Sequence, residues 1–142
     1  MDYTYEYFQK SADYVKKIVP WTPDVAIVLG SCLGPFADTI EDPIVIDYKD
    51  IPNFLVSTVK SHAGKLIFGT VAGKRVVCMS GRFHSYEGYD FEQLVIPVRL
   101  FKLLGVKATI LTNAAGAINP SYRPGDVMIV SDHIKFTGAS PL

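Results

Sequence analysis

Three short, mainly apolar runs, each followed at once by small and polar residues, constrain the possible folds of this chain most strongly. They span residues 25–29, 76–79 and 108–111. The first two are continuous apolar runs, which are typical of strands buried on both faces, as in a parallel sheet covered by helices, and the third predicts a further strand. The sequence therefore predicts an α/β fold, with a mixed, mostly parallel central sheet flanked by helices in a three-layer sandwich.

The segments before and between these runs predict more of the sheet and a first covering helix. Apolar residues recur every three or four positions over residues 4–19, which indicates an amphipathic helix that ends before a proline. Residues 44–46 predict a further strand. Residues 65–71 and 75–80 predict two strands joined by a tight turn at Gly73, so the sheet contains a hairpin.

A second helix and a last strand complete the expected topology. Asp90 and Gln93 form a capping-box pattern that opens a helix ending at Gly105, with a kink expected at Pro97. Residues 126–134 predict a strand that no helix follows. One face of the sheet would then lack a covering layer, so the domain is expected to be truncated at this point.

The composition narrows the class of partner. Hydrophobic residues make up 49% and charged residues 20% of the 142 residues, as in an ordinary globular domain. Lys plus Arg and Asp plus Glu number 14 each, so no net charge favours nucleic acid or an anionic membrane. The N-terminus is acidic and aromatic, unlike a secretion leader, and no apolar run approaches bilayer length. The expected location is the cytoplasm, and the expected partner is a small molecule.

Two cysteines, Cys32 and Cys78, lie in unrelated contexts with no metal-ligand spacing. Reduced thiols are the default for such a pair in a cytosolic protein. The sequence therefore predicts no structural zinc.

Four small or polar clusters lie at the ends of the predicted strands. Arg82, His84 and Tyr86 form the most informative one, because alternate side chains of an extended segment point the same way and would offer a guanidinium, an imidazole and a phenol to one ligand. The alternative for each residue is a surface ion pair or a core histidine. A doubly wound sheet would bring such strand ends together. The other clusters are Gly30-Ser31, Ser61-His62-Ala63-Gly64 and Thr112-Asn113-Ala114-Ala115-Gly116.

Gly30 and Ser31 have the layout of an oxyanion site. A glycine allows a tight turn after the strand, Ser31 presents a hydroxyl, and the free N–H groups of a following helix would face the anion. No Walker lysine follows, and Ser31 acting as a plain helix N-cap is the alternative. Because an antiparallel hairpin returns to its starting edge, His62 is expected near Arg82.

Taken together at these spacings, the four clusters resemble the purine nucleoside phosphorylases of the trimeric type. The resemblance runs from Tyr5 to Leu142, which is about half the length of such an enzyme. It implies that residues 1–142 form the N-terminal part of a single nucleoside phosphorylase domain. A trimer is expected from the resemblance if the full domain is present.

The resemblance also implies roles for individual residues. Arg82 and His84 would hold phosphate, with His84 as the catalytic residue, and Tyr86 would lie against the ribose. Cys32 departs from the family, which has glycine there, and adds a Cβ near the phosphate turn. The further phosphate-binding residues implied are Ser31, His62 and the backbone of Ala114, with Gly30, Asn113 and Ala115 as supporting residues.

The reaction implied by the resemblance is phosphorolysis of a purine nucleoside to the free base and ribose 1-phosphate. Inorganic phosphate is then the co-substrate, and no metal or other cofactor is required. The purine contacts of the family come from its C-terminal half, so this chain alone is expected to bind the anion with little turnover. Two alternatives remain open: a methylthioadenosine phosphorylase, and a non-catalytic remnant that binds phosphate or pairs with full-length subunits.

Overall fold

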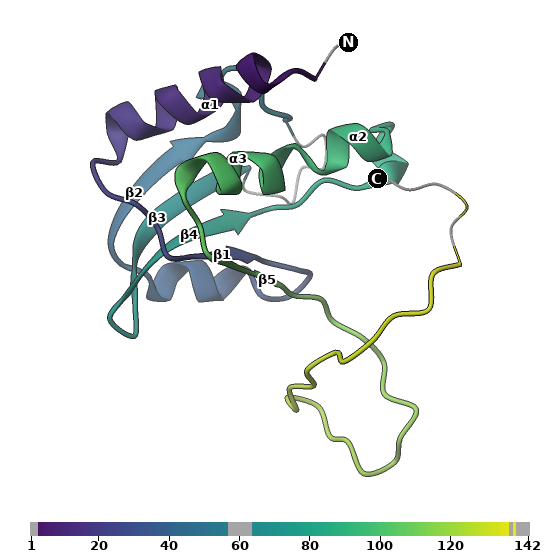
Figure 1. Cartoon of the computed structure of the whole chain (residues 1–142). Helices are drawn as coiled ribbons and strands as arrows, with labels where there is room; N and C mark the ends of the chain where they lie inside the picture. The colour runs from purple at the N-terminus through teal and green to yellow at the C-terminus, as the bar shows by residue number, and fades with distance from the viewer. Residues whose placement is uncertain (1–2, 57–63, 137, 139–142) are drawn as a thin grey trace.

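A five-stranded mixed sheet lies at the centre of the computed structural model, which describes residues 3–56, 64–136 and 138 (Figure 1). The strand order is β2-β3-β4-β1-β5. β1 pairs in parallel with β4 and β5, and β3 pairs antiparallel with β2 and β4, so every strand except β3 runs in one direction. The predicted mixed, mostly parallel sheet is confirmed. Its strands are β1 (Val25–Val28), β2 (Glu41–Asp47), β3 (Lys65–Val71), β4 (Lys74–Ser80) and β5 (Ala108–Leu111).

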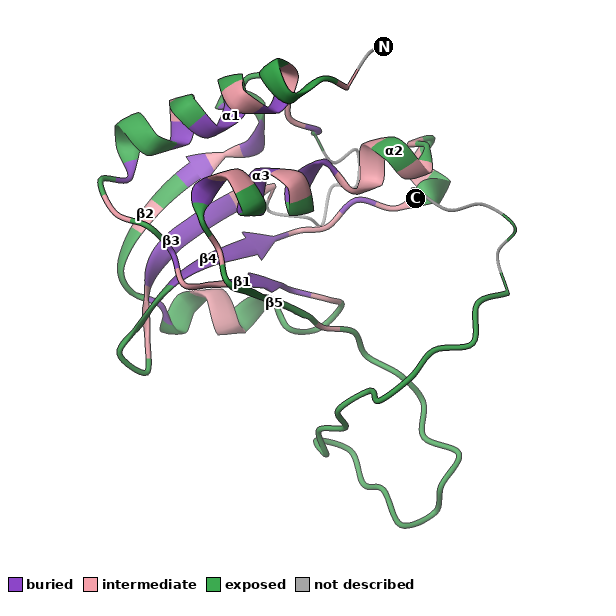
Figure 2. Ribbon diagram, in the orientation of Figure 1, coloured by how far each residue is buried: buried purple, intermediate pink, exposed green. Residues whose placement is uncertain are grey.

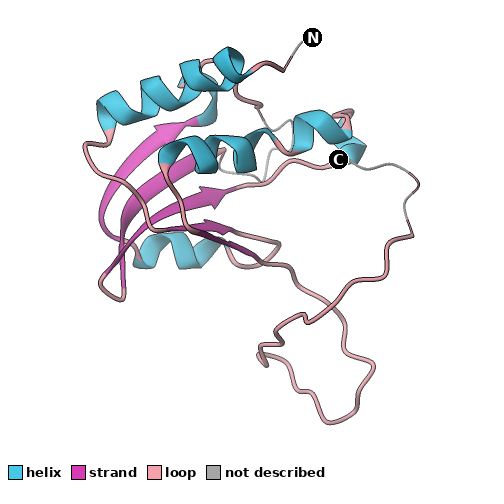
Figure 3. Cartoon of the chain, viewed as in Figure 1, coloured by secondary structure: helices cyan, strands magenta, loops and turns pink. Residues whose placement is uncertain are grey.

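Helices lie on both faces of this sheet, as predicted (Figure 3). α1 (Tyr5–Ile18) and α3 (Ile96–Leu104) cover one face, and the 3₁₀ helix η1 (Gly34–Thr39) covers part of the other (Figure 1). The helical layer on the face that η1 covers is therefore thin. The remaining helical segments are α2 (Phe91–Leu94) and the short 3₁₀ turns η2 (Tyr48–Asp50) and η3 (Ser85–Glu87).

α1 forms where the apolar periodicity predicts it. The Thr4 hydroxyl accepts a hydrogen bond from the backbone N–H of Tyr7 at 3.2 Å, so the helix is capped at its N-terminus. Phe8, Ala12 and Val15 form its buried stripe. This stripe packs against the sheet and anchors the first layer.

The core follows from the uninterrupted apolar runs in β1 and β4, which are buried on both faces, whereas all four residues of β5 are exposed (Figure 2). Phe68 and Val77 are buried under α1 and α3, whereas Ile67 and Cys78 face η1. Burial raises the pKa of the Cys78 thiol to about 11, so it stays protonated at neutral pH. Both cysteines are free, and Cys32 is exposed.

The segment before β5 departs in one respect from the expected helix. Asp90 accepts a hydrogen bond from the Gln93 backbone N–H at 2.8 Å, and Gly105 ends the helix with φ 89°, both as predicted. The expected kink at Pro97 is wrong, because the helix breaks at Val95 and Pro97 lies in the first turn of α3. A proline in a first turn removes no intrahelical hydrogen bond.

The strand predicted at residues 126–134 is also wrong. Residues 113–136 are exposed, and the chain after β5 contains no strand among its described residues (Figure 2). Val127 and Ile129 are 91% and 90% exposed. A strand forms only where a neighbour completes its backbone hydrogen bonds, and this segment has no such neighbour in the described chain.

In the part of the chain that the structure describes, no helix is both long and apolar enough to span a bilayer.

Candidate functional site

The ends of β1, β4 and β5 meet at one edge of the sheet. The backbone N–H of Gly30 donates to the Thr112 hydroxyl at 2.9 Å. Arg82 donates through Nη1 to the Thr112 carbonyl at 3.1 Å. Hydrogen bonds therefore connect residues that lie 82 and 30 positions apart in sequence, as expected for the carboxyl ends of neighbouring parallel strands.

Position 30 requires glycine, because its backbone lies too close to the backbone of Thr112 and Asn113 for a side chain to fit. A Cβ atom at Gly30 would lie 2.4 Å from the Thr112 carbonyl oxygen and 2.8 Å from the Asn113 Cα. The Thr112 hydroxyl also donates to the Val28 carbonyl at 2.9 Å, so one side chain connects the ends of β1 and β5. Sequence analysis assigned no role to Thr112; its hydroxyl directly after a strand was the available signal.

Arg82, His84 and Tyr86 come together as the sequence predicts. Arg82 Nε donates to His84 Nε2 at 3.0 Å, and the rings of His84 and Tyr86 stack with centroids 4.6 Å apart and planes 17° apart. The reason differs from the predicted one for Tyr86. The extended backbone ends at His84, and the 3₁₀ turn η3 then brings the Tyr86 ring over the imidazole.

Glu87 fixes the imidazole from its other side, and sequence analysis missed this residue. Its carboxylate is 1% exposed, accepts a hydrogen bond from the His84 backbone N–H at 2.9 Å and lies 3.1 Å from His84 Nδ1. Because Nε2 accepts from Arg82, the proton of a neutral His84 lies on Nδ1 and is donated to Glu87. The three-residue spacing from His84 to Glu87 was the signal in the sequence.

The loop that carries Arg82 is held by an aromatic cluster. Phe83 is buried and its ring centroid lies 5.3 Å from that of Tyr48 and 5.8 Å from that of Tyr89. The Tyr48 hydroxyl donates to the Gly81 carbonyl at 2.5 Å. Burial raises the pKa of Tyr48, so the phenol keeps the proton that it donates. Ring packing and a hydrogen bond thus hold the residues on both sides of Arg82.

A cavity of about 920 Å³ opens beside these residues. Gly30, Ser31 and Arg82 line it, and so does Lys65. Asp38 is the acidic residue in its lining. Two cations and a serine hydroxyl at a strand-end cavity favour a small anion.

Comparison with known proteins identifies the family at this point. Residues 24–142 match the Phosphorylase superfamily. The chain belongs to this superfamily. Purine nucleoside phosphorylase 1 of Bacillus subtilis (strain 168) is 51% identical over 134 residues, which cover 94% of this chain and 49% of that protein. Purine nucleoside phosphorylase of Rattus norvegicus is 44% identical over 144 residues, with 99% of this chain and 50% of that protein covered.

Solved structures of purine nucleoside phosphorylases have the same fold as this chain. Isoform 2 of purine nucleoside phosphorylase from Schistosoma mansoni, in complex with cytosine and ribose-1-phosphate, matches with a TM-score of 0.78 at 44% identity, over 87% of this chain and 43% of that one. The Schistosoma mansoni enzyme in complex with inosine also matches at 0.78 and 45% identity. This member of the phosphorylase superfamily spans about half the length of the relatives that it matches.

Between Ser31 and η1, this superfamily member departs from the expected geometry. An α-helix beginning at Ser31 is absent from the described chain: a turn follows, and η1 begins at Gly34 after Leu33 as its N-cap. Both the predicted helix N-terminus and the alternative of a Ser31 cap are therefore wrong. The physical reason is Cys32, whose φ of 68° lies in the left-handed region and cannot continue a right-handed helix.

Other predicted site residues are less tightly placed. Ser31 is exposed in the cavity lining, and Tyr86 is 74% exposed. The backbone carrying Asn113, Ala114 and Ala115 leaves β5 and is exposed, and the Asn113 side chain donates to the Ala114 carbonyl at 3.3 Å. His62 lies outside the described residues. In the described part of the predicted hairpin, Lys65 at the start of β3 pairs with Ser80 at the end of β4.

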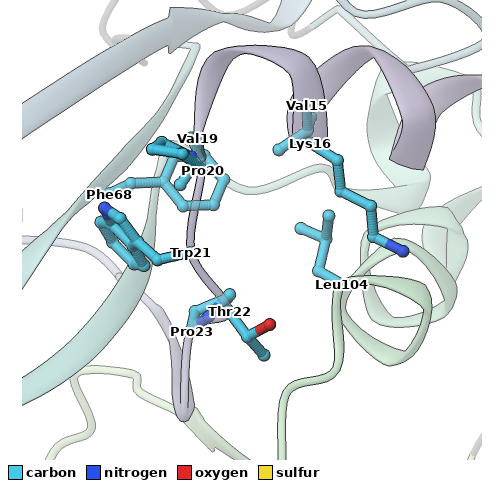
Figure 4. A pocket seen from close by; sticks show the side chains of 9 residues that line it. All are labelled: Val15, Lys16, Val19, Pro20, Trp21, Thr22, Pro23, Phe68 and Leu104. Atoms are coloured by element: carbon cyan, nitrogen blue, oxygen red, sulfur yellow. The ribbon is translucent and has the colours of Figure 1, made fainter.

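A second, smaller cavity of about 200 Å³ lies on the opposite face of the sheet, between α1, α3 and β3 (Figure 4). Val15, Val19, Phe68 and Leu104 contribute most of its apolar wall. The polar cluster around Arg82 is therefore not at this cavity. Among the described residues, no group of three or more His, Cys, Asp or Glu side chains could hold a metal ion.

Proposed function

We propose that residues 1–142 form the N-terminal part of a single nucleoside phosphorylase domain and carry the phosphate- and ribose-binding half of a purine nucleoside phosphorylase site. The reaction is phosphorolysis of a purine nucleoside to the free base and ribose 1-phosphate, with inorganic phosphate as co-substrate and no metal or other cofactor. The observation that supports it most is Arg82, which contacts both His84 and the Thr112 carbonyl where three strands end.

Phosphate would replace the contacts that Arg82 makes in the structure. A guanidinium offers parallel N–H donors that match two phosphate oxygens, and Ser31 and the Ala114 backbone would supply further hydrogen bonds. His62 is proposed as another phosphate ligand. Held beneath C1′, the phosphate is both the nucleophile and the negative charge that stabilises the cationic, oxocarbenium-like carbon as the glycosidic bond breaks.

His84 would move or hold a proton in this arrangement. Its Nδ1–H already points at the Glu87 carboxylate, so Nε2 is the atom that faces the anion once Arg82 turns to phosphate. Nε2 can take a proton from a protonated phosphate oxygen, and the Glu87 carboxylate then stabilises the imidazolium. We assign Tyr86 to the ribose, because its ring stacks on His84 and leaves an exposed face.

The purine would be bound by the part of the fold that this chain does not span. The solved relatives include one in complex with inosine and one in complex with ribose-1-phosphate, which supports a nucleoside and a sugar phosphate as ligands of the complete site. The relatives are named purine nucleoside phosphorylases, and this favours that activity over methylthioadenosine phosphorolysis. We propose that the complete enzyme is a cytoplasmic trimer.

A single-chain chimera tests the activity. It joins residues 1–142 to the half of Bacillus subtilis purine nucleoside phosphorylase 1 that the alignment leaves uncovered. With inosine we expect hypoxanthine and ribose 1-phosphate only when phosphate is present, and a higher rate than with methylthioadenosine. A folded chimera that binds phosphate yet releases no base would make the non-catalytic alternative correct.

Replacing Glu87 with glutamine is expected to weaken phosphate binding by the 142-residue chain about tenfold to a hundredfold. Glutamine keeps the size and can still accept from the His84 backbone, but it removes the charge that stabilises an imidazolium. A hydrogen bond to a charged group is worth about 1.5–3 kcal/mol, and about 1.4 kcal/mol corresponds to tenfold in affinity. Calorimetric titration with inorganic phosphate at several pH values measures the effect.

Glu92→Gln is the matched control for this variant. Glu92 lies in α2, is exposed, and loses the same charge at a distance from the imidazole. If both variants bind phosphate like the original chain at every pH, Glu87 does not position His84 for the anion.

A further inference from the structure

Tyr48 lies where β2 ends and where the chain enters β3. It directly follows the last residue of β2, and β3 lies between β2 and β4 in the sheet (Figure 1). The Tyr48 backbone N–H donates to the Gly64 carbonyl at 2.8 Å, one residue before β3 begins. A Cβ at Gly64 would lie 3.7 Å from Tyr48 Cδ2, so the phenol ring passes beside that glycine. Tyr48 therefore connects the end of β2 with the backbone that enters β3.

The Tyr48 hydroxyl binds the peptide group in front of Arg82. It donates to the Gly81 carbonyl at 2.5 Å and lies 3.4 Å from the Ser80 carbonyl, at the end of β4. The Gly81 carbonyl belongs to the same peptide group as the Arg82 N–H, and a peptide group is planar. Gly81 has a φ of 97°, a left-handed conformation that glycine adopts readily, so the chain turns there. The hydroxyl thus fixes the peptide plane from which the Arg82 side chain leaves the turn.

The Tyr48 ring holds the residue on the other side of Arg82. Phe83 is buried with its ring centroid 5.3 Å from that of Tyr48, and the Phe54 ring packs 5.1 Å from Tyr48 and 5.8 Å from Phe83. Tyr48 itself is 1% exposed. A phenylalanine would fill the same space, so ring packing alone requires no hydroxyl. A buried hydroxyl is costly unless it is hydrogen-bonded, and the nearest acceptor of this one is the Gly81 carbonyl.

We propose that Tyr48 is a positioning residue for the anion site, because its hydroxyl sets the direction from which the Arg82 guanidinium reaches the anion. This role rests on the proposed function, in which Arg82 holds phosphate. Gly81 and Arg82 both line the cavity of about 920 Å³, whereas Tyr48 is not among its lining residues. Tyr48 therefore acts on the anion through the backbone and without contacting it. Loss of the hydroxyl leaves the charge and length of Arg82 unchanged but frees the peptide group in front of it to rotate.

Tyr48→Phe tests this role without changing the size of the buried ring. Two quantities are measured in the 142-residue chain: the affinity for inorganic phosphate by titration calorimetry, and the exchange of single backbone amides with deuterated water by NMR. Phosphate binding should weaken about tenfold, as expected when one buried carbonyl loses its donor. The His84 amide, which donates to Glu87 at 2.9 Å, should exchange at least about tenfold faster. The Gln93 amide, which donates to Asp90 at 2.8 Å, is the internal reference and should not change.

Ser11→Ala is the matched control for the loss of a buried hydroxyl. Ser11 lies on α1, is also 1% exposed, and donates to the Pro52 carbonyl at 2.6 Å. This variant should lose a similar free energy of unfolding in urea but keep the phosphate affinity and the His84 exchange rate of the original chain. The proposal is overturned if Tyr48→Phe leaves either quantity unchanged, or if Ser11→Ala changes both as much. An original chain that binds no phosphate would refute the proposed function instead, and the His84 exchange rate would then decide whether Tyr48 fixes the loop.

Discussion

Replacing Arg82 with alanine is expected to weaken binding of inorganic phosphate to this chain at least about a hundredfold. The guanidinium is half-buried and already engages two acceptors, His84 Nε2 at 3.0 Å and the Thr112 carbonyl at 3.1 Å. Removing one partner of a desolvated charge pair costs about 2–5 kcal/mol, and about 1.4 kcal/mol is tenfold in affinity. Titration calorimetry with inorganic phosphate at constant ionic strength measures the loss.

Two further variants separate the effect of the guanidinium's shape on phosphate binding from the effect of its charge. Arg82→Lys keeps the charge but not the planar fork, so its affinity should fall between those of the original chain and the alanine variant. Arg75→Ala removes the same charge at the opposite end of β4, where Arg75 lies over the Trp21 ring at 5.4 Å. It should bind phosphate normally. Phosphate affinity that survives Arg82→Ala would mean that the site has been assigned to the wrong residues.

The sheet and its first covering layer were predictable because local pattern and tertiary burial agree. Residues 25–28 are apolar without interruption and become a strand covered on both faces. The hairpin follows from Gly73, whose φ of 73° suits a tight turn. Thr4 and Asp90 cap helices where their side chains offer oxygens to orphan N–H groups. Each of these features is determined by residues close together in sequence.

The predictions that failed depend on distant or missing neighbours. Residues 126–134 have the composition of a strand, but pairing depends on a partner that the described chain does not provide. The helix expected at Ser31 fails because Cys32 adopts a left-handed conformation that its residue type does not favour. Glu87 and Thr112 gain their roles from contacts made after folding, with His84 and with the end of β1.

The prediction and the structure agree best at the site, because one geometric rule applies to all of its parallel strands. The carboxyl ends of parallel strands lie along the same side of the sheet. Gly30, Arg82 and Thr112 therefore meet there independently of the loop conformations. The loops themselves set the finer positions. Tyr86 reaches His84 through a 3₁₀ turn, which alternation along a strand could not anticipate.

Gly30→Ala is expected to destabilise the chain by about 2–4 kcal/mol, since overpacking a core costs about 1–3 kcal/mol and a lost hydrogen bond about 1 kcal/mol. The new methyl group would lie 2.4 Å from the Thr112 carbonyl oxygen and 2.8 Å from the Asn113 Cα. Both are backbone atoms, so no side-chain rotation relieves the clash. The ends of β1 and β5 must separate, which breaks the 2.9 Å hydrogen bond from the Gly30 N–H to the Thr112 hydroxyl.

Urea unfolding followed by circular dichroism measures this loss, and Gly34→Ala is its control. Gly34 lies four residues further along the chain, at the start of η1, and a Cβ there meets nothing within 4 Å. Its replacement should change the free energy of unfolding by less than about 1 kcal/mol, since open space accepts a methyl group and alanine favours helix over glycine. Because Arg82 donates to the Thr112 carbonyl, the Gly30 variant should also bind phosphate more weakly under conditions where it remains folded. Equal unfolding midpoints for the two variants would contradict the contact between the ends of β1 and β5 on which the site depends.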